Sequence, residues 1–185
     1  MNKLRLTVKV SKSLGVVTEY QTEKIYGFEG DCKRLSGTID TFKVTYSSSV
    51  YKEITEGFYN VDGCVRRTKD GTYVYATSIK KVKEPKEYIN EVELIGEVSK
   101  PPHFRITSKT ETSITDIFIK VMRNSVKFDT LQCIAWNKYA HFAKGLGVGD
   151  IIHIYGRLQS KVYTDGKRAA EISCSNIEII KEDSN

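Results

Sequence analysis

Residues 149–167 read GDIIHIYGRLQSKVYTDGK, and this stretch decides the fold of the chain. An apolar segment runs into Gly156, and basic and aromatic residues then follow as far as the Asp165-Gly166 turn. An alternating strand that ends in an Asp-Gly turn predicts a β-hairpin. This hairpin carries cations and a stackable ring, Tyr163, and a surface for single-stranded nucleic acid requires that combination.

The same alternation recurs along the chain and predicts an all-β protein. Leu4, Leu6 and Val8 alternate with polar residues, which is the pattern of a half-buried strand. Only residues 137–146 have convincing helical spacing, and Gly147 ends that helix. The predicted strands are 4–10, 24–34, 38–46, 57–67, 72–82, 92–96, 114–123, 130–136, 151–163 and 168–180.

The two halves of the sequence are weak copies of each other. Residues 57–71 and 149–166 both contain a glycine, an apolar strand, a second glycine, a basic strand and an Asp-Gly turn, in that order. Residues 83–87, which read KEPKE, are a predicted linker. We therefore expect two small barrels in tandem, over residues 1–83 and 89–181, with one short helix in the second. A single larger antiparallel sandwich is the alternative.

The composition is that of a globular protein with a basic surface. The charged fraction is 28%, the hydrophobic fraction 39% and the formal net charge +6. A basic balance favours polyanionic partners. Most of the excess positive charge falls in the first half of the sequence. We therefore expect the N-terminal barrel to supply much of the electrostatic attraction for such a partner.

Several classes of protein are not expected. No apolar run is long enough for a transmembrane helix, and the N-terminus lacks the core of a signal peptide. The four cysteines form no Cys-x-x-Cys pair, so we expect no zinc site, reduced thiols and a cytoplasmic location. The three histidines are scattered and no phosphate-binding loop occurs, so we expect neither an enzyme nor a bound cofactor.

Four segments of the second half carry a family resemblance. Residues 90–98 read NEVELIGEV, 101–105 read PPHFR, 131–140 read LQCIAWNKYA and 156–160 read GRLQS. In this order the segments resemble bacterial-type single-stranded DNA-binding proteins. The resemblance implies an OB-fold, a five-stranded Greek-key barrel, and it extends over residues 90–180.

The sequence departs from the family pattern in two ways. Ser125 and Thr130 occupy positions where a well-studied subset of the family carries stacking tryptophans, whereas Trp136 and Tyr163 fall on aromatic positions. The family's long acidic tail with an apolar tip is not matched by residues 181–185, KEDSN. Partner recruitment through such a tail is therefore not expected. A phage or mobile-element variant is favoured, and a monomer or homodimer is expected.

Two sets of side chains are candidates for binding nucleic acid, because stacking needs flat rings and phosphates need cations. The stacking candidates are Trp136, Tyr163, Tyr155 and Phe128 in the second half and Tyr46, Tyr73, Tyr26 and Tyr75 in the first. The phosphate-binding candidates are Lys120, Arg123, Lys127, Lys138, Arg157, Lys161, Lys167 and Arg168 in the second half and Lys33, Arg34, Lys43, Arg66 and Arg67 in the first.

The expected function is binding of single-stranded DNA without sequence preference, by phosphate neutralisation and base stacking. Replication, recombination and mobile-element transfer are the processes that expose such strands. Two alternatives stay open. The chain is either a protein–protein adaptor of a replication or primosome complex that uses an OB surface, or an RNA-binding OB protein.

Overall fold

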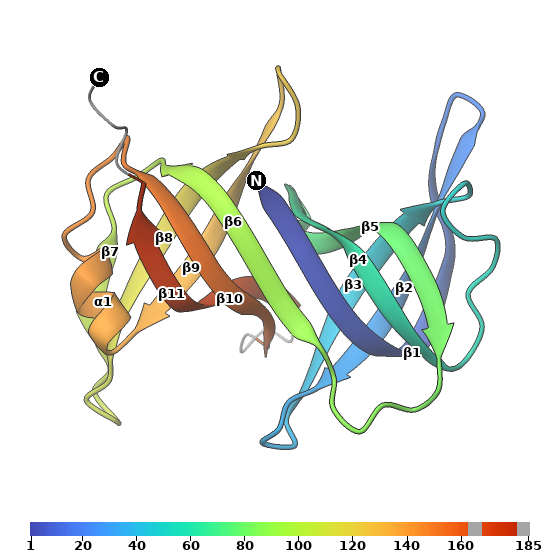
Figure 1. Ribbon diagram of the computed structural model, residues 1–185, viewed down its shortest axis with the longest axis horizontal. Coiled ribbons are helices and arrows are strands. Elements are labelled where there is room, and N and C mark those ends of the chain that lie inside the picture. Colours follow the sequence, from blue (N-terminus) through green and yellow to red (C-terminus); the bar gives the residue numbers. More distant parts are fainter. Residues whose placement is uncertain (163–167, 181–185) are drawn as a thin grey trace. The chain divides into compact units, whose positions relative to one another are not determined.

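The computed structural model describes residues 1–162 and 168–180, and almost all of the regular secondary structure in these residues is β-strand (Figure 1). One short helix, α1 (Lys138–Ala143), lies among the later strands. The first five strands are β1 (Asn2–Tyr20), β2 (Glu23–Lys33), β3 (Ile39–Ser47), β4 (Phe58–Thr68) and β5 (Gly71–Val82). The others are β6 (Asn90–Val98), β7 (His103–Ile106), β8 (Ser113–Met122), β9 (Phe128–Trp136), β10 (Ile151–Val162) and β11 (Arg168–Ile179).

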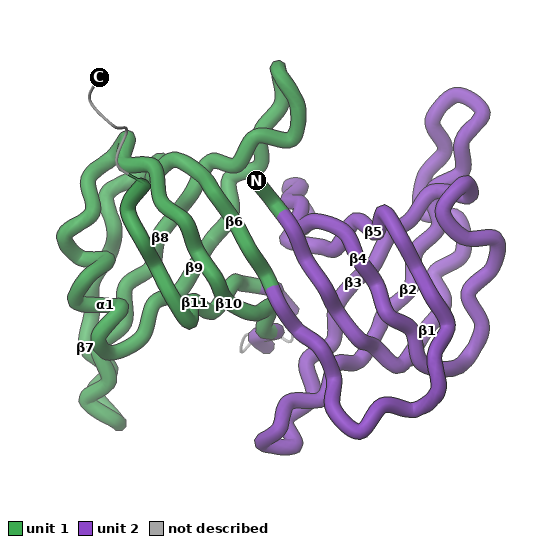
Figure 2. The backbone as a smooth tube through the Cα atoms, viewed as in Figure 1, with its two compact units in different colours: residues 1–2, 92–159, 171–185 green, residues 3–91, 160–170 purple. Residues whose placement is uncertain are grey.

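The chain divides into two compact units (Figure 2). Unit 1 comprises residues 1–2, 92–159 and 171–185, and unit 2 comprises residues 3–91 and 160–170. These ranges differ from the predicted ones mainly at residues 160–170. The described parts of that segment, residues 160–162 at the end of β10 and 168–170 at the start of β11, belong to unit 2.

Unit 2 is a closed barrel of five strands. β1 pairs antiparallel with both β2 and β4, β4 pairs antiparallel with β5, and β3 pairs antiparallel with β2 and parallel with β5. The side chains that alternate inward are apolar and make one core, as period-two patterning requires. The fully buried members include Leu6, Val8, Phe28, Phe42, Val44, Tyr59, Val61, Val65 and Val74.

Unit 1 repeats this plan. β6 pairs antiparallel with β8 and β10, β8 pairs antiparallel with β9, and β9 pairs parallel with β11, which neighbours β10. The short β7 adds to β8. The core of this barrel is also aliphatic, and its fully buried members include Leu94, Ile117, Ile119, Leu131, Cys133, Ile152, Ile154, Leu158 and Ile172.

The predicted fold class is confirmed: two five-stranded barrels stand in tandem, with one short helix in the second. The helix is shorter than predicted and buries Ala140 and Ala143. Phe142 on this helix is 43% exposed. Strand β1 continues to Tyr20, well beyond the predicted end at residue 10, and its outer half forms a long hairpin with β2.

Each barrel has an equivalent point, on β4 in unit 2 and on β10 in unit 1, where two backbones approach too closely for a side chain. A Cβ atom added at Gly63 would lie 2.2 Å from the carbonyl oxygen of Tyr75. One added at Gly156 would lie 2.3 Å from the carbonyl oxygen of Ser173. Both distances are far below any van der Waals contact, so only glycine fits. We call Gly63 and Gly156 the crossing glycines.

The crossing in unit 1 generates a stability prediction. We expect Gly156→Ala to lower the free energy of unfolding by about 3 kcal/mol, because the overpacked Cβ meets backbone that cannot move alone. Urea unfolding followed by the fluorescence of Trp136, which lies in unit 1, measures this change. Gly145→Ala is the matched control, since its Cβ would meet only an ordinary contact at 3.5 Å. Equal midpoints for the two variants would contradict the role of the crossing.

Candidate nucleic-acid interface

The outward face of β8 and β9 carries an uninterrupted series of rings, cations and small polar groups. Inward residues of β8 are fully buried, so Phe118 and Lys120 between them point outward. The register sets Lys120 opposite Thr130 and Phe118 opposite Gln132 on β9. Phe128 opens β9 on the same face and is 50% exposed. The face is therefore flat, partly apolar and open to solvent.

Two lysines stand over two of these rings. The Nζ atom of Lys120 lies 4.4 Å from the centre of the Phe128 ring, and the Nζ atom of Lys100 lies 5.1 Å from the centre of the Phe118 ring. Lys100 is held there because the neighbouring Ser99 donates both its N–H and its hydroxyl to the carbonyl of Phe118. We call Lys100, Phe118, Lys120 and Phe128 the β8–β9 row.

The β8–β9 row includes two residues that sequence reasoning missed. Neither Phe118 nor Lys100 is among the predicted stacking or phosphate-binding residues. Phe118 lies within β8, and Lys100 follows the end of β6. The sequence signal for Phe118 is its alternation with fully buried isoleucines, which places it outward. No local signal identifies Lys100, because its contact with β8 depends on barrel closure.

The structure separates the predicted stacking residues. Trp136 ends β9, is half-buried and donates its indole N–H to the hydroxyl of Ser173 at 3.2 Å. Tyr46 is only 2% exposed and packs on the Tyr26 and Phe28 rings. Its ring belongs to the core and is not available to a base, so this prediction is corrected. Tyr163 lies outside the residues that the structure describes, as does the predicted cation Lys167.

Tyr155 and Tyr73 lie on other strands than the β8–β9 row. Tyr155, on β10, is 40% exposed and its ring centre lies 4.4 Å from that of His153. His153 Nε2 lies 3.0 Å from the Glu93 carboxylate. Partial burial, together with the nearby charge of Glu93, raises the pKa of Tyr155. Tyr73 is half-buried on the outward face of β5.

Two of the predicted phosphate-binding arginines are instead structural. Arg34 Nε and Nη2 donate to the Asp40 carboxylate at 2.5 and 2.7 Å. Arg123 Nε and Nη2 donate to Asp129 at 2.9 and 2.5 Å. Both carboxylates are almost fully buried, and the charge of each arginine is neutralised in its own pair. The repeated signal, an arginine six residues before an aspartate in each half, is visible in the sequence.

The other predicted cations are dispersed over the two barrels. Arg157 is half-buried and its Nη2 donates weakly to Gln159 at 3.4 Å. Lys138 stands over the Tyr139 ring at the start of α1. Arg66 stands over the Tyr75 ring on the outward face of unit 2. The exposed cations of the set are Lys33, Lys43, Arg67, Lys127, Lys138, Lys161 and Arg168.

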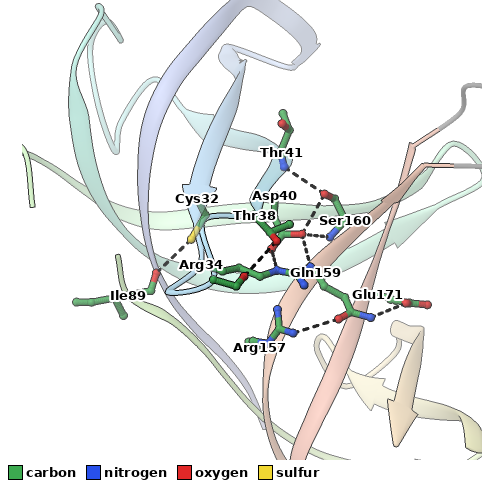
Figure 3. A network of polar contacts seen from close by, with 11 residues as sticks. Cys32, Arg34, Thr38, Asp40, Thr41, Ile89, Arg157, Gln159, Ser160 and Glu171 are labelled. Atoms are coloured by element: carbon green, nitrogen blue, oxygen red, sulfur yellow. Dashed lines mark hydrogen bonds and ion pairs between the residues drawn. The ribbon is translucent and has the colours of Figure 1, made fainter. Parts of the chain in front are cut away.

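Asp40 anchors Ser160, near the end of β10, within unit 2 (Figure 3); we call the described residues 160–162 and 168–170 the anchored segment. Besides Arg34, its Oδ1 atom accepts hydrogen bonds from the backbone N–H of Ser160 at 2.7 Å and from the Ser160 hydroxyl at 3.1 Å. The backbone N–H of Thr41 also reaches the Ser160 hydroxyl. Burial alone would raise the pKa of Asp40, but the hydrogen bonds from Arg34 and Ser160 outweigh it, and the pKa is lowered. The anchored segment carries the exposed cations Lys161 and Arg168.

The comparisons with known proteins agree with this geometry. Residues 89–180 match the Single-strand binding protein family. Over these residues the chain is similar to that family. A single-stranded DNA-binding protein of Clostridium tetani (strain Massachusetts / E88) is 33% identical to this chain over 88 residues. The match covers 43% of this chain and 61% of that relative.

Two solved structures are similar to this chain over its whole length. Wild-type single-stranded DNA-binding protein from Thermus aquaticus is similar with a TM-score of 0.80 and 17% identity, over 100% of this chain and 95% of the other. A deletion mutant of the Thermus aquaticus protein gives a TM-score of 0.77 and 19% identity, over 100% and 97%. At this identity the likeness establishes the fold, including the N-terminal barrel that the family match does not reach.

The family positions that lack tryptophan lie beside the β8–β9 row. Thr130 is opposite Lys120, and Phe128 is two residues before it on the same strand. Ser125 lies in the exposed turn between β8 and β9. Phe128 is therefore the flat side chain that lies next to these positions.

The described residues hold neither a metal-binding group nor a membrane-spanning helix. Across residues 1–162 and 168–180, no group of three or more histidine, cysteine, aspartate or glutamate side chains is arranged to hold a metal ion. Within the same ranges, no helix has the length and apolar character needed to cross a membrane. The four cysteines are free thiols, of which Cys32, Cys133 and Cys174 are buried.

The Asp40 anchor predicts a pH-dependent stability. We expect Asp40→Asn to lower the free energy of unfolding by about 3 kcal/mol at pH 7, because it removes one partner of a buried ion pair. The folded-state pKa of Asp40 is lowered, so its contribution is complete above the unfolded pKa of about 3.9 and is lost as the pH falls through the folded pKa. Denaturant unfolding by circular dichroism between pH 7 and pH 3 measures the difference between the two proteins.

The matched control is Asp62→Asn. Asp62 is 60% exposed and lies 3.9 Å from Arg5, so its replacement should cost less than about 1 kcal/mol. The difference between the wild-type protein and Asp40→Asn should shrink steadily below about pH 4. A difference that persists unchanged at pH 3 would contradict the role of the ionised carboxylate.

Proposed function

We propose that the chain binds single-stranded DNA without sequence preference, and that the β8–β9 row is its principal contact surface in unit 1. The observation that carries this proposal is the pairing of the exposed Phe128 ring with Lys120 and of the half-buried Phe118 ring with Lys100. A base stacks on a ring while the neighbouring ammonium group neutralises the phosphate beside it. The mechanism is binding alone, and no bond is made or broken.

The family of residues 89–180 and the fold of the whole chain support this proposal. A protein of this kind coats strands that are exposed in replication, recombination or mobile-element transfer, and these are the processes that we propose for it. Trp136, half-buried at the end of β9, is a built-in reporter of binding on this face. Cations on the anchored segment, Lys161 and Arg168, extend the positive surface on unit 2.

The proposal is tested by titrating the protein with oligo-dT, oligo-rU and duplex DNA while following Trp136 fluorescence. We expect quenching by oligo-dT and an affinity that falls linearly with the logarithm of the salt concentration. A protein–protein adaptor would show neither effect. Stronger binding of oligo-rU would favour an RNA-binding function, and stronger binding of duplex would contradict the proposal.

Single substitutions in the β8–β9 row separate stacking from charge. We expect Phe118→Leu and Phe128→Leu each to weaken oligo-dT binding by about 1–2 kcal/mol while the salt dependence stays the same, because a stacking partner is lost and no cation is. Lys120→Gln should flatten the slope of log affinity against log salt by about 0.7, the value for one phosphate contact on a single strand.

Lys109→Gln is the matched control, because Lys109 is an exposed lysine in the turn between β7 and β8. Its affinity and salt slope should equal those of the unsubstituted protein. The row is not the contact surface if Phe118→Leu and Phe128→Leu bind oligo-dT as tightly as this control does.

A further inference from the structure

The pairing of strands shows which residues occupy equivalent places in the two barrels. Val44 and Val74 are paired in the parallel ladder of unit 2, and Cys133 and Ile172 are paired in that of unit 1. The crossing glycines mark the same point on β4 and β10. Counting along the ladders from these points gives six equivalent pairs: Glu29 and Phe118, Asp31 and Lys120, Ile39 and Phe128, Arg66 and Gln159, Tyr73 and Glu171, and Tyr75 and Ser173.

The face of unit 2 that is equivalent to the β8–β9 row carries charged side chains of both signs and no ring. Glu29 takes the place of Phe118, and Asp31 takes the place of Lys120. The exposed Lys43 lies directly opposite Glu29 on β3. The Asp31 carboxylate accepts hydrogen bonds from the hydroxyls of Thr41 at 2.7 Å and Ser11 at 3.2 Å, which hold it on this face. The β2–β3 face therefore lacks the pairs of ring and lysine that make up the β8–β9 row of unit 1.

The adjacent face of unit 2, formed by β4 and β5, carries rings and a cation instead. The guanidinium carbon of Arg66 lies 3.6 Å from the centre of the Tyr75 ring. Arg66 is also directly opposite Tyr73 across the two strands. Both tyrosines are half-buried, so part of each ring stays open to solvent. We call Arg66, Tyr73 and Tyr75 the β4–β5 cluster.

The equivalent face of unit 1 is closed by polar contacts. Gln159 Nε2 donates to Glu171 Oε1 at 2.7 Å, and both side chains are buried. Ser173, the equivalent of Tyr75, accepts the indole N–H of Trp136. No ring stands at these places in unit 1. The two barrels thus carry their rings and cations on different pairs of strands.

Arg66 is placed to act as a flat surface and not as a point charge. Its Nε atom is buried and makes no hydrogen bond to any part of the chain that the structure describes. A guanidinium that lies over an aromatic ring keeps a second planar face, and a planar guanidinium face stacks on a nucleobase. A lysine ammonium has no such face, although it carries the same charge.

We propose that unit 2 binds bases of the same single strand through the β4–β5 cluster, with Arg66 as a stacking platform supported by Tyr75. The strand then lies on non-equivalent faces of the two barrels. This inference rests on the proposed function, since it assigns a second contact surface to the same ligand. The ligand class is an unpaired nucleobase, and the stacking mode places no demand on its sequence.

Photo-crosslinking of the unsubstituted protein tests the placement directly. The protein is bound to oligo-dT that carries 5-iododeoxyuridine at a single position, and the complex is irradiated. The crosslinked residues are then identified by mass spectrometry. We expect crosslinks at Tyr73 or Tyr75 in unit 2 and at Phe118, Phe128 or Trp136 in unit 1. Crosslinks on residues 29–33 or 39–43 of unit 2, or none in unit 2, would overturn the inference.

Substitutions test the role of Arg66. Arg66→Lys keeps the charge and loses the flat group, so we expect about tenfold weaker oligo-dT binding with an unchanged salt slope. Tyr75→Leu should weaken binding by about the same factor, because the platform loses its support. Ser78→Ala, also on β5, and Glu29→Gln, on the β2–β3 face, are controls. Their oligo-dT affinities should stay within about twofold of that of the unsubstituted protein.

Each outcome decides the inference. Normal affinity of Arg66→Lys, combined with a flatter salt slope for Arg66→Gln, would make Arg66 a phosphate contact and overturn the stacking role. If Phe118→Leu weakens oligo-dT binding and Tyr75→Leu does not, this inference is contradicted and the proposed function is not. A protein that fails to bind oligo-dT under any condition would contradict the proposed function as well.

Discussion

The closure of each barrel depends on a crossing where backbone meets backbone. Gly63 and Gly156 allow this contact, since a methyl group at either site would overlap a carbonyl oxygen. The crossing sets how β4 faces β5 and how β10 faces β11, and a shift of one residue in a strand would turn each of its inward side chains outward. The outward positions of β8, β9, β4 and β5 are therefore as well determined as the core. A binding surface of rings and cations needs this constraint, because its geometry comes from strands and not from loops.

The sequence predicted the barrels because their signals are local. Alternation with period two identifies strands, and the ordered glycines and Asp-Gly turns identify the repeat. The same alternation places Tyr46 on one face of its strand with Phe42 and Val44, and that face lies in the core. Its assignment as a stacking residue overlooked this periodicity and gave weight to residue type alone.

Other features of the site depend on contacts between distant segments and were not predictable from local patterns. Lys100 reaches the Phe118 ring only because Ser99 is bonded to β8. Ser160 is held in unit 2 because Asp40, 120 residues earlier in the sequence, accepts its hydrogen bonds. Arg34 and Arg123 are good phosphate-binding candidates in a list of cations, and only the fold shows that each has a buried carboxylate as its partner.

The placement of charge matters more for this surface than its sum. The first half of the chain holds most of the excess positive charge, yet its β2–β3 face carries Glu29 and Asp31. At physiological ionic strength a charge acts over a screening length of about 8 Å, so a phosphate senses the residues of one face and not a barrel's total. On the β2–β3 face the charge of Glu29 is opposed by Lys43, directly across the two strands, and no ring lies beside them. We propose that a strand is held where rings and cations coincide, and the two barrels, although built on one plan, bring them together on different strands.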